Sequence, residues 1–410
     1  MYNSMMKSLF RSLALCLLLA GSLPAVLSCG DASVVPLTPV NPDTPSKPDT
    51  PSTPDTPGDP ASDVKSTIFK QNADGHKIYR IPAIVRSAKG TLLCFAEGRT
   101  NGPDDNGDID MVVKRSTDGG KTWGSMILID DAGTDRYGNP VPIALESGRI
   151  VLAYGWSVAS SSMSSRVFVV YSDDDGLTWT GKKEITMQIT AEGQSIYMTG
   201  PVHGIVKQLA PHKGRLIVPL YGAGSGGSNC VIYSDDNGAN WTHGGWIPGN
   251  RGGEPTVAER GDGSILLNTR NYKSSDSFRY QCVSTDGGAT WGPVTVTPLI
   301  EPGNGCQGAL LTYDLGTSAT DAKILFSNPS HSSSRRYGSV KLSLDGGLTW
   351  GRMFRYTADS TSDMYSSYSD LVLLGGTKIG VAYEAGYQNN LGILFRSFEY
   401  SEINKPYAYE

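Results

Sequence analysis

The hydrophobic positions of this chain fall in short runs that end at turns rich in aspartate and glycine. Three examples are MVVKRS at 111–116, RVFVVYS at 166–172 and NCVIYS at 229–234, which are apolar throughout or alternate apolar with polar side chains. Alternation with a period of two, bounded by turn residues, is typical of β-strands, and the part of the chain after residue 62 keeps no helical period. The 49 glycines fit a fold with many turns. The sequence therefore predicts an all-β protein.

One turn sequence, with serine, aspartate, glycine and tryptophan at fixed positions, occurs five times. Its copies begin at residues 116, 172, 234, 284 and 343, so successive copies are 56, 62, 50 and 59 residues apart. Repeats of this length that each contain four short strands are characteristic of β-propellers. Residues 63–410 have room for about six such units, which predicts a six-bladed β-propeller. We expect the first strand, near 66–70, to pair with the C-terminal strands near 379–397 and close the ring.

The repeated turn has the features of a structural hairpin rather than those of a reactive site. In STDGGKTW at 116–123, the glycines supply the positive φ that a tight hairpin needs, and Asp118 can accept hydrogen bonds from turn amides. Trp123 is large enough to hold the turn against its own blade. The alternative is a calcium loop, but the glutamate expected at its twelfth position is missing and the aromatic residue follows too early. We therefore expect the five copies to be scaffold and the functional residues to lie elsewhere.

The first 62 residues have the composition of targeting and linker segments. Basic residues at 7 and 11 and an apolar run at 13–20 precede Val-Leu-Ser-Cys at 26–29, which predicts a secretory signal over 1–28. The residues before Cys29 resemble a bacterial lipoprotein signal, in which the cysteine becomes the lipidated N-terminus; the alternative is an ordinary signal with an incidental cysteine. From 36 to 60 every third residue is proline, which favours an extended stalk over 29–62. We expect an exported protein, anchored by one lipid to a bacterial envelope membrane, with its globular domain over 63–410.

Charge and metal-binding patterns argue against several classes of function. The net charge of −5 argues against a nucleic-acid partner. The five histidines form no HExxH motif or comparable spacing, so we expect neither a metal nor another cofactor. The four cysteines that follow Cys29 have irregular spacing, and a domain of this size does not need a disulfide. We expect a monomer.

Three segments outside the repeat carry arginine at the start or end of an apolar strand. They are IYRIPAI at 78–84 with Arg80, LLNTRNY at 266–272 with Arg270, and SSSRRYGSVKLS at 332–343 with Arg335 and Arg336. Burying an arginine is costly unless an anion pairs with it, and a guanidinium can bind a carboxylate through two parallel hydrogen bonds. A lone arginine of this kind fits a surface salt bridge better. Because the three segments belong to different repeat units, their arginines could converge on a propeller axis and bind a carboxylate.

The YRIP sequence at 79–82, the dispersed arginines and the five Asp-box turns together resemble the bacterial sialidases of glycoside hydrolase family 33. The resemblance covers essentially all of the globular domain and implies sialylated glycans as partners. In that family three arginines bind the carboxylate on C2 of sialic acid. The matching motifs give these positions to Arg80, Arg270 and Arg336, the last preferred over its neighbour Arg335 by its spacing to GSVKLS.

The resemblance also implies an aspartate on a loop of the first unit as the general acid and base. The segment AEGRTNGPDDNGDID at 96–110 offers four aspartates, and the family's spacing to a following Ile-Asp pair selects Asp105 over those at 104, 108 and 110. A glycine-rich loop over a pocket suits an acid that has to enclose a substrate. Arg99, six residues earlier, would contact the region of the substrate carboxylate.

The family's nucleophile is a tyrosine assisted by a glutamate, an exception to the usual pair of carboxylates in glycosidases. The anomeric carbon of sialic acid carries a carboxylate that would repel an anionic nucleophile, whereas a neutral phenol avoids this repulsion. The Y-S-x-L motif selects Tyr368 over Tyr365. Glu254 in RGGEPTVAE is preferred to Glu259 as its partner. We expect two nearby arginines to lower the pKa of the phenol.

Four further positions follow from the resemblance. Glu384 in VAYEAG would hold Arg80 in place. Asn139 in YGNPVPIA would meet the N-acetyl group of the substrate, and Gln307 in GCQGAL would lie near its glycerol tail. His203 in TGPVHGI lies on a segment that resembles a pocket rim, and a structural role is favoured for it over a catalytic one.

These assignments predict a retaining exo-sialidase. The alternatives are a trans-sialidase or an intramolecular trans-sialidase that uses the same site, and a carbohydrate-binding propeller without turnover. The presence of Asp105, Glu254 and Tyr368 disfavours the binding propeller. No lectin-like insertion is apparent, which favours hydrolysis over transfer.

Overall fold

The computed structural model describes residues 63–161, 165–190, 195–223, 228–249, 252–272, 277–303, 305–357, 364–386 and 392–407. The predicted signal sequence, the stalk and Cys29 lie outside the described residues. About half of the described residues form β-strands, and the helical elements among them are α1 (Thr186–Ile189) and the 3-10 turn η1 (Tyr400–Glu402). Within these ranges no helix is long and apolar enough to span a membrane.

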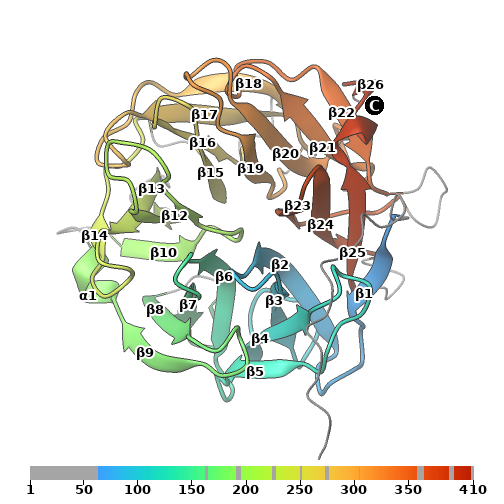
Figure 1. The fold of residues 1–410 in the computed structure, drawn as a ribbon. Helices are drawn as coiled ribbons and strands as arrows, with labels where there is room; N and C mark the ends of the chain where they lie inside the picture. The colour runs from blue at the N-terminus through green and yellow to red at the C-terminus, as the bar shows by residue number, and fades with distance from the viewer. Residues whose placement is uncertain are drawn as a thin grey trace, which may run out of the picture. The chain divides into compact units, whose positions relative to one another are not determined.

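The described strands form five hydrogen-bonded sheets, which lie around a common centre (Figure 1). One sheet consists of β1 (Lys65–Phe69), β25 (Gly392–Glu399), β24 (Lys378–Ala385) and β23 (Ser369–Gly375). The largest consists of β2 (Ile78–Arg86), β3 (Leu92–Arg99), β4 (Ile109–Ser116), β5 (Ile127–Asp130), β6 (Arg136–Ala144), β7 (Ile150–Ser157), β8 (Arg166–Ser172) and β9 (Thr180–Glu184). The third consists of β10 (Ser195–Thr199), β11 (Ile205–Val206), β12 (Leu216–Ala223), β13 (Ser228–Ser234) and β14 (Thr242–His243). The fourth consists of β15 (Pro255–Glu259), β16 (Ile265–Thr269), β17 (Phe278–Ser284) and β18 (Thr295–Ile300). The fifth consists of β19 (Ala309–Asp314), β20 (Lys323–Pro329), β21 (Gly338–Ser343), β22 (Arg352–Arg355) and β26 (Lys405–Pro406).

The all-β, propeller-like architecture is as predicted, but the hydrogen bonding does not give six separate blades. The eight-stranded sheet contains two antiparallel groups, β2–β5 and β6–β9, which are joined by a single parallel pair between Ile109 and Arg136. This bridge lies at the starts of β4 and β6 and merges the two groups into one sheet. The repeat spacing could not reveal such a contact, because it reports the length of the units and not the pairing between them.

The two ends of the described chain meet in one sheet, as predicted. Strand β1 pairs antiparallel with β25, and Ser66 lies opposite Phe395. The first strand and a C-terminal strand thereby close the ring. In Figure 1 the strands nearest the centre are β2, β6, β10, β15, β19 and β23.

The hydrophobic core lies between neighbouring groups of strands. Successive side chains of a strand point to opposite faces, so one strand can pack against both of its neighbours. Val151 of β7 packs with Val218 of β12, whereas Leu152 packs on the other face with Phe95 of β3 and Val113 of β4. These side chains are fully buried.

The repeated turn is a hydrogen-bonded scaffold. In its first copy Ser116 Oγ donates to Asp118 at 2.8 Å and accepts from the Gly120 amide at 2.9 Å. Asp118 accepts further hydrogen bonds from the amide and the hydroxyl of Thr122 at 3.0 and 2.6 Å. A Cβ at Gly120 would lie 2.2 Å from the Phe395 ring, so the turn requires glycine there for space as well as for its φ of 89°. The contacts within the turn therefore agree with a scaffold role.

Trp123 holds this turn differently from the prediction. Its Nε1 donates to Ser66 Oγ at 3.0 Å, and its ring lies edge-on to Phe395 with centroids 5.7 Å apart. Both partners belong to the neighbouring sheet of β1 and β25. The tryptophan thus joins two sheets instead of pinning the turn against its own.

Candidate active site

Tyr368 lies at the centre of the candidate active site, directly before the inner strand β23. Its hydroxyl donates a hydrogen bond to Glu254 Oε1 and accepts one from Arg270 Nη1 at 3.1 Å. Two further guanidinium groups lie beside the ring, with Arg80 Cζ at 5.4 Å and Arg335 Cζ at 5.5 Å from its centroid. Three arginines and one glutamate thus surround a buried phenol.

The hairpin formed by β15 and β16 explains why Glu254 and Arg270 meet. Glu254 directly precedes β15 and Arg270 directly follows β16, and the Arg270 amide donates to the Glu254 carbonyl at 3.2 Å. Their side chains form an ion pair of 2.8 Å. The alternative partner, Glu259, lies at the far end of β15 and pairs with the buried Lys207 at 2.6 Å. The structure therefore brings Glu254, and not Glu259, to Tyr368.

The environment of Tyr368 favours the neutral phenol. Burial raises the pKa of Tyr368, and the Glu254 carboxylate raises it further. Arg270, Arg335 and Arg80 act in the opposite direction, but the pKa remains well above its ordinary value. The expected lowering by the arginines is therefore present, but burial and Glu254 outweigh it. Because the phenol keeps its proton at neutral pH, it can act as a nucleophile only if a base such as Glu254 accepts that proton.

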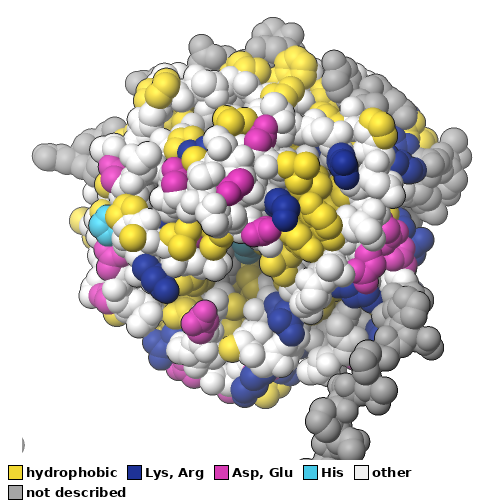
Figure 2. All heavy atoms as spheres, turned by 45° about the horizontal axis from the view of Figure 1, so that its top comes forward, with side chains coloured by type: hydrophobic (Ala, Val, Ile, Leu, Met, Phe, Trp, Pro, Cys, Tyr) yellow, Lys and Arg dark blue, Asp and Glu magenta, His cyan; other side chains and the backbone are white. Residues whose placement is uncertain are grey.

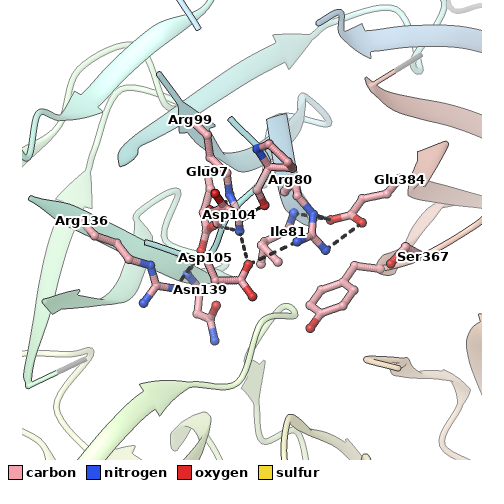
Figure 3. Close-up of polar contacts among 12 residues, drawn as sticks. Arg80, Ile81, Glu97, Arg99, Asp104, Asp105, Arg136, Asn139, Ser367 and Glu384 are labelled. Carbon is pink, nitrogen blue, oxygen red and sulfur yellow. Dashed lines mark hydrogen bonds and ion pairs between the residues drawn. The ribbon is translucent and has the colours of Figure 1, made fainter. Parts of the chain in front are cut away.

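Arg80 is held by Glu384, which lies on β24 and points toward the Arg80 guanidinium (Figure 3). Arg80 Nε and Nη2 donate to the two oxygens of Glu384 at 3.2 and 3.3 Å. One of those oxygens also accepts the amide of Ile81 at 2.8 Å. Ile81 has a φ of 59°, which is unfavourable for a β-branched residue, and it precedes a proline, which normally imposes an extended conformation. Glu384 therefore stabilises a strained bend that aims Arg80 at the site.

The third arginine at the site is Arg335, which corrects the assignment of Arg336. Arg335 Nη1 donates to Ser367 Oγ at 2.8 Å, next to Tyr368. Arg336 is exposed to solvent, and its backbone forms an isolated bridge with Tyr365. The structure therefore places Arg335 beside the Tyr368 ring and Arg336 in solvent.

Asp105 lies on the loop between β3 and β4 and reaches the arginine cluster from the other side (Figure 3). One oxygen, Oδ1, lies 3.2 Å from Arg80 Nη1 and 2.9 Å from Arg99 Nη2. The side chain remains 61% exposed. Burial raises the pKa of Asp105, but Arg99, Arg80 and Arg136 outweigh this effect and lower it overall. Asp105 is therefore ionised in this state.

Arg99 has a different environment from the one expected of a substrate-binding residue. Its Nε and Nη2 donate to Glu97, and its Nη1 donates to the carbonyls of Pro103 and Asp104 at 2.5 and 2.8 Å. With the contact to Asp105, all five N–H groups of the guanidinium are used. Arg99 therefore fixes the Asp105 loop, and no donor is left for a substrate.

Glu97 is a site residue that the sequence prediction missed. It is fully buried on β3, accepts both bonds from Arg99, and accepts the amide of Asn139 at 3.0 Å. A Cβ at Gly138 would lie 2.6 Å from the other Glu97 oxygen, so glycine is needed for this close approach. A charged residue inside the apolar run LLCFAEG was the available signal.

Asn139 and Gln307 are buried and use their amides within the protein. Asn139 Nδ2 donates to the Thr199 carbonyl at 2.8 Å and to Tyr221 at 3.3 Å. Gln307 Nε2 donates to the carbonyls of Pro201 and Ser369 at 2.9 and 3.0 Å, and its Oε1 accepts the Ser369 amide at 2.9 Å. Gln307 therefore supports the strand that follows Tyr368, and its amide hydrogens are not available to a glycerol tail.

His203 forms a buried ion pair with Asp370, a second residue that the sequence prediction missed. His203 Nδ1 lies 2.7 Å from Asp370 Oδ1. The other carboxylate oxygen accepts the amides of His203 and of Ile84 on β2, at 3.0 and 2.9 Å. Asp370 lies two residues after Tyr368, so this pair connects β23 to β2 and to the loop between β10 and β11. The expected structural role of His203 agrees with these contacts.

The arrangement of the described metal-ligating and charged side chains bears on the predictions about metals and nucleic acids. No group of three or more His, Cys, Asp or Glu residues within the described ranges is arranged to hold a metal ion. Figure 2 shows one face of the molecule, on which acidic and basic side chains are interspersed. This face has no extended basic area of the kind that binds nucleic acids.

Comparison with known proteins assigns the family. The BNR repeat-like domain matches residues 90–381. A sialidase from Micromonospora viridifaciens is 32% identical over 347 residues, which cover 79% of this chain and 52% of that protein. The chain thus spans about half the length of that relative.

Two solved structures have the same fold. The Hadza microbial sialidase Hz136 superposes with a TM-score of 0.72 at 25% identity, covering 83% of this chain and 69% of the other. The intramolecular trans-sialidase from Ruminococcus gnavus superposes with a TM-score of 0.69 at 21% identity, covering 82% and 98%. With the domain match over 90–381 and the sequence identity to a sialidase, these findings show that the chain belongs to the sialidase family.

Proposed function

We propose that the protein is a retaining exo-α-sialidase, which hydrolyses terminal sialic acids from glycoconjugates through a covalent sialyl-tyrosine intermediate. The observation that carries this proposal is the position of the Tyr368 hydroxyl between Glu254 and Arg270. Two more arginines beside the same ring supply positive charge for a substrate that carries a carboxylate next to the reacting carbon.

The first step forms the covalent intermediate. Arg80, Arg270 and Arg335 bind the carboxylate on C2 of the sialic acid. The Tyr368 oxygen attacks the anomeric carbon while Glu254 accepts the phenolic proton, and Asp105 donates a proton to the departing glycosidic oxygen. A neutral phenol approaches the carboxylate-bearing carbon without the repulsion that an anionic nucleophile would meet.

The second step reverses these proton movements. Asp105 accepts a proton from a water molecule, whose oxygen attacks the anomeric carbon. The bond to Tyr368 breaks, and Glu254 returns the proton to the phenolic oxygen. Two displacements at the same carbon release sialic acid with net retention of configuration.

The same site could transfer the sialyl group instead of hydrolysing it, either to a sugar or within the sialic acid itself. Product analysis separates these outcomes, since hydrolysis gives free sialic acid, transfer gives a new sialoside, and the intramolecular reaction gives an anhydro sugar. A non-catalytic sialoglycan-binding propeller would give none of these products. We favour hydrolysis because the Micromonospora viridifaciens relative, at 32% identity, is a sialidase, whereas the intramolecular trans-sialidase of similar fold is 21% identical.

The test is proton NMR of the reaction with a sialyllactose, together with turnover of a fluorogenic sialoside. We expect the α-anomer of free sialic acid to be released first. We expect Tyr368→Phe to lower kcat by at least about 100-fold, because it removes the attacking oxygen. Near wild-type turnover in this variant would overturn the proposed mechanism.

Three features outside the site complete the proposal. We propose that residues 1–28 are removed as a signal, that Cys29 carries the lipid, and that 29–62 form a stalk holding a monomeric domain off the envelope membrane. We also propose that the two groups of the eight-stranded sheet act as separate blades, so that the propeller has six. The face-to-face packing of Leu152 against Phe95 and the single bridge at Ile109 support this count.

A further inference from the structure

Asp105 occupies an unusual position for a group that has to donate a proton. Its carboxylate is 61% exposed, but it reaches inward onto two buried guanidinium groups, those of Arg80 and Arg99 (Figure 3). The same oxygen, Oδ1, contacts both of them, at 3.2 and 2.9 Å. In this arrangement the acid of the proposed mechanism is an anion held by two cations.

The two arginines have different relations to Asp105. The guanidinium of Arg99 is saturated by Glu97, by the loop carbonyls of Pro103 and Asp104, and by Asp105 itself. It is therefore a fixed part of the scaffold. Arg80 turns Nε and Nη2 toward Glu384 and turns Nη1 toward Asp105. The Asp105 carboxylate is therefore bonded to the side of Arg80 that a substrate carboxylate has to reach.

We propose that the carboxylate of the substrate replaces Asp105 on Arg80, and that this exchange releases the Asp105 carboxyl to take up the proton it then donates. The inference rests on the proposed function, which requires Arg80 to bind the C2 carboxylate. Arg99 keeps the Asp105 loop in place during the exchange through the carbonyls of Pro103 and Asp104. Arg99 and Glu97 are thus positioning residues for the acid.

The charges around Asp105 support the direction of this change. The charged groups that face it are Arg80 on β2, Arg99 on β3 and Arg136 on β6, and the phenol of Tyr272 lies within electrostatic reach. Loss of the contact with Arg80 removes one cation, and the arriving carboxylate adds an anion. Both changes favour the protonated carboxyl.

The exchange also has a consequence for specificity. A glycoside without a carboxylate would leave Asp105 bonded to Arg80 and therefore ionised. Such a compound could occupy the site, but the departing oxygen would receive no proton. The site would thus reject neutral glycosides at bond cleavage as well as at binding.

Calorimetric titration with N-acetylneuraminic acid and with its methyl ester tests the exchange. The titrations are made at pH 5.5 in buffers of different ionisation enthalpy, so that the slope of heat against that enthalpy gives the protons taken up per ligand. For the acid we expect an uptake that approaches one proton. For the ester, and for the acid with Asp105→Asn, we expect an uptake near zero.

Asp104→Asn is the matched control, since it removes an exposed carboxylate from the neighbouring position and should keep the wild-type uptake. Binding of the acid without proton uptake by the wild-type protein would overturn the exchange and leave the proposed function standing. Equal uptake with Asp105→Asn would overturn it as well, because the proton would belong to another group. Absence of binding by N-acetylneuraminic acid would contradict both proposals.

Discussion

Glu384→Gln tests how the fold positions Arg80, the arginine proposed to bind the substrate carboxylate. Glu384 is buried, and its two oxygens accept from Arg80 Nε and Nη2 at 3.2 and 3.3 Å and from the Ile81 amide at 2.8 Å. Glutamine keeps the size of the side chain but removes its charge and one of its acceptors. Arg80 would then be a buried cation with the exposed Asp105 as its remaining carboxylate partner among the contacts described above.

The expected loss follows from these contacts. Removing one partner of a buried ion pair typically costs about 3–5 kcal/mol. We expect a value near the lower end, about 3 kcal/mol, because the remaining amide oxygen can still accept from Ile81 and Asp105 still faces Arg80. The strained φ of Ile81 itself represents about 1–3 kcal/mol that the surrounding bonds have to offset, so its bend should loosen.

Urea denaturation followed by tryptophan fluorescence measures the free energy of unfolding, and steady-state kinetics measures KM for a sialoside. We expect KM to rise by more than about ten-fold, because Arg80 loses the group that orients it. Glu146→Gln, at an exposed position, is the matched control and should change neither quantity. A loss of stability below about 1 kcal/mol with unchanged KM would refute the role given to Glu384.

Three further predictions concern other parts of the structure. Arg335→Lys should raise KM for a sialoside by about ten-fold or more, because lysine cannot replace the planar guanidinium, whereas Arg336→Lys should leave KM unchanged. Asp118→Ala should leave kcat unchanged and lower the free energy of unfolding by about 1 kcal/mol. The hydrogen bonds of the turn lower the pKa of Asp118 to about 2, and solvent screening at this exposed position reduces the stabilisation that this shift implies. Burial lowers the pKa of His203, but the Asp370 carboxylate outweighs it and raises the pKa overall, so the pair stabilises the fold fully below about pH 6.5 and less as pH rises through the raised value. His203→Gln should therefore cost more stability at pH 5.5 than at pH 9, as measured by denaturation at the two pH values.

Each of these predictions has an outcome that contradicts it. A larger effect on KM from Arg336→Lys than from Arg335→Lys would restore the assignment made from the sequence. A large fall in kcat with Asp118→Ala, without loss of stability, would give the repeated turn a role in catalysis. An equal cost of His203→Gln at both pH values would show that the histidine is not ionised in the folded protein.

The sequence predicted those parts of the molecule that depend on local pattern. The hydrogen bonds of the repeated turn could be predicted from its sequence, because its serine, aspartate and glycine lie within eight consecutive residues and bond to one another. The pairing of β1 with β25 could be predicted because residues 63–410 hold about six repeat units, and a closed propeller brings its first and last strands together. The YRIP motif located Arg80, and the segment around Tyr368 located the phenol that the structure surrounds with three arginines.

The remaining features depend on contacts between distant segments. The choice between Arg335 and Arg336 is decided by the backbone bridge to Tyr365, which turns one side chain outward. Arg99 has the right spacing for a substrate contact, but the loop that follows it consumes its donors. Gln307 is likewise used by the backbone of a strand 62 residues away in the chain. Spacing alone does not reveal whether a polar group is already satisfied.

Two buried carboxylates of the site were not predicted from the sequence, although each stands out as a charged residue in an apolar strand. Glu97 lies inside the apolar strand β3 and Asp370 lies at the start of the apolar strand β23, and each is fully buried. Such residues are rare without partners, because a buried carboxylate needs hydrogen bonds or a cation. Both carboxylates connect separate segments of the chain. Glu97 accepts from Arg99 and from the Asn139 amide, and Asp370 accepts from the amides of His203 and Ile84.

Trapping of the covalent intermediate would show directly whether Tyr368 is the nucleophile. The protein is incubated with 2,3-difluorosialic acid, whose fluorine at C3 slows hydrolysis of the intermediate, and is then digested and analysed by mass spectrometry. We expect one fluorosialyl adduct on the peptide that contains Tyr368, and no adduct on this peptide in Tyr368→Phe. An active protein that forms no adduct, or forms it on another residue, would contradict a sialyl-tyrosine intermediate.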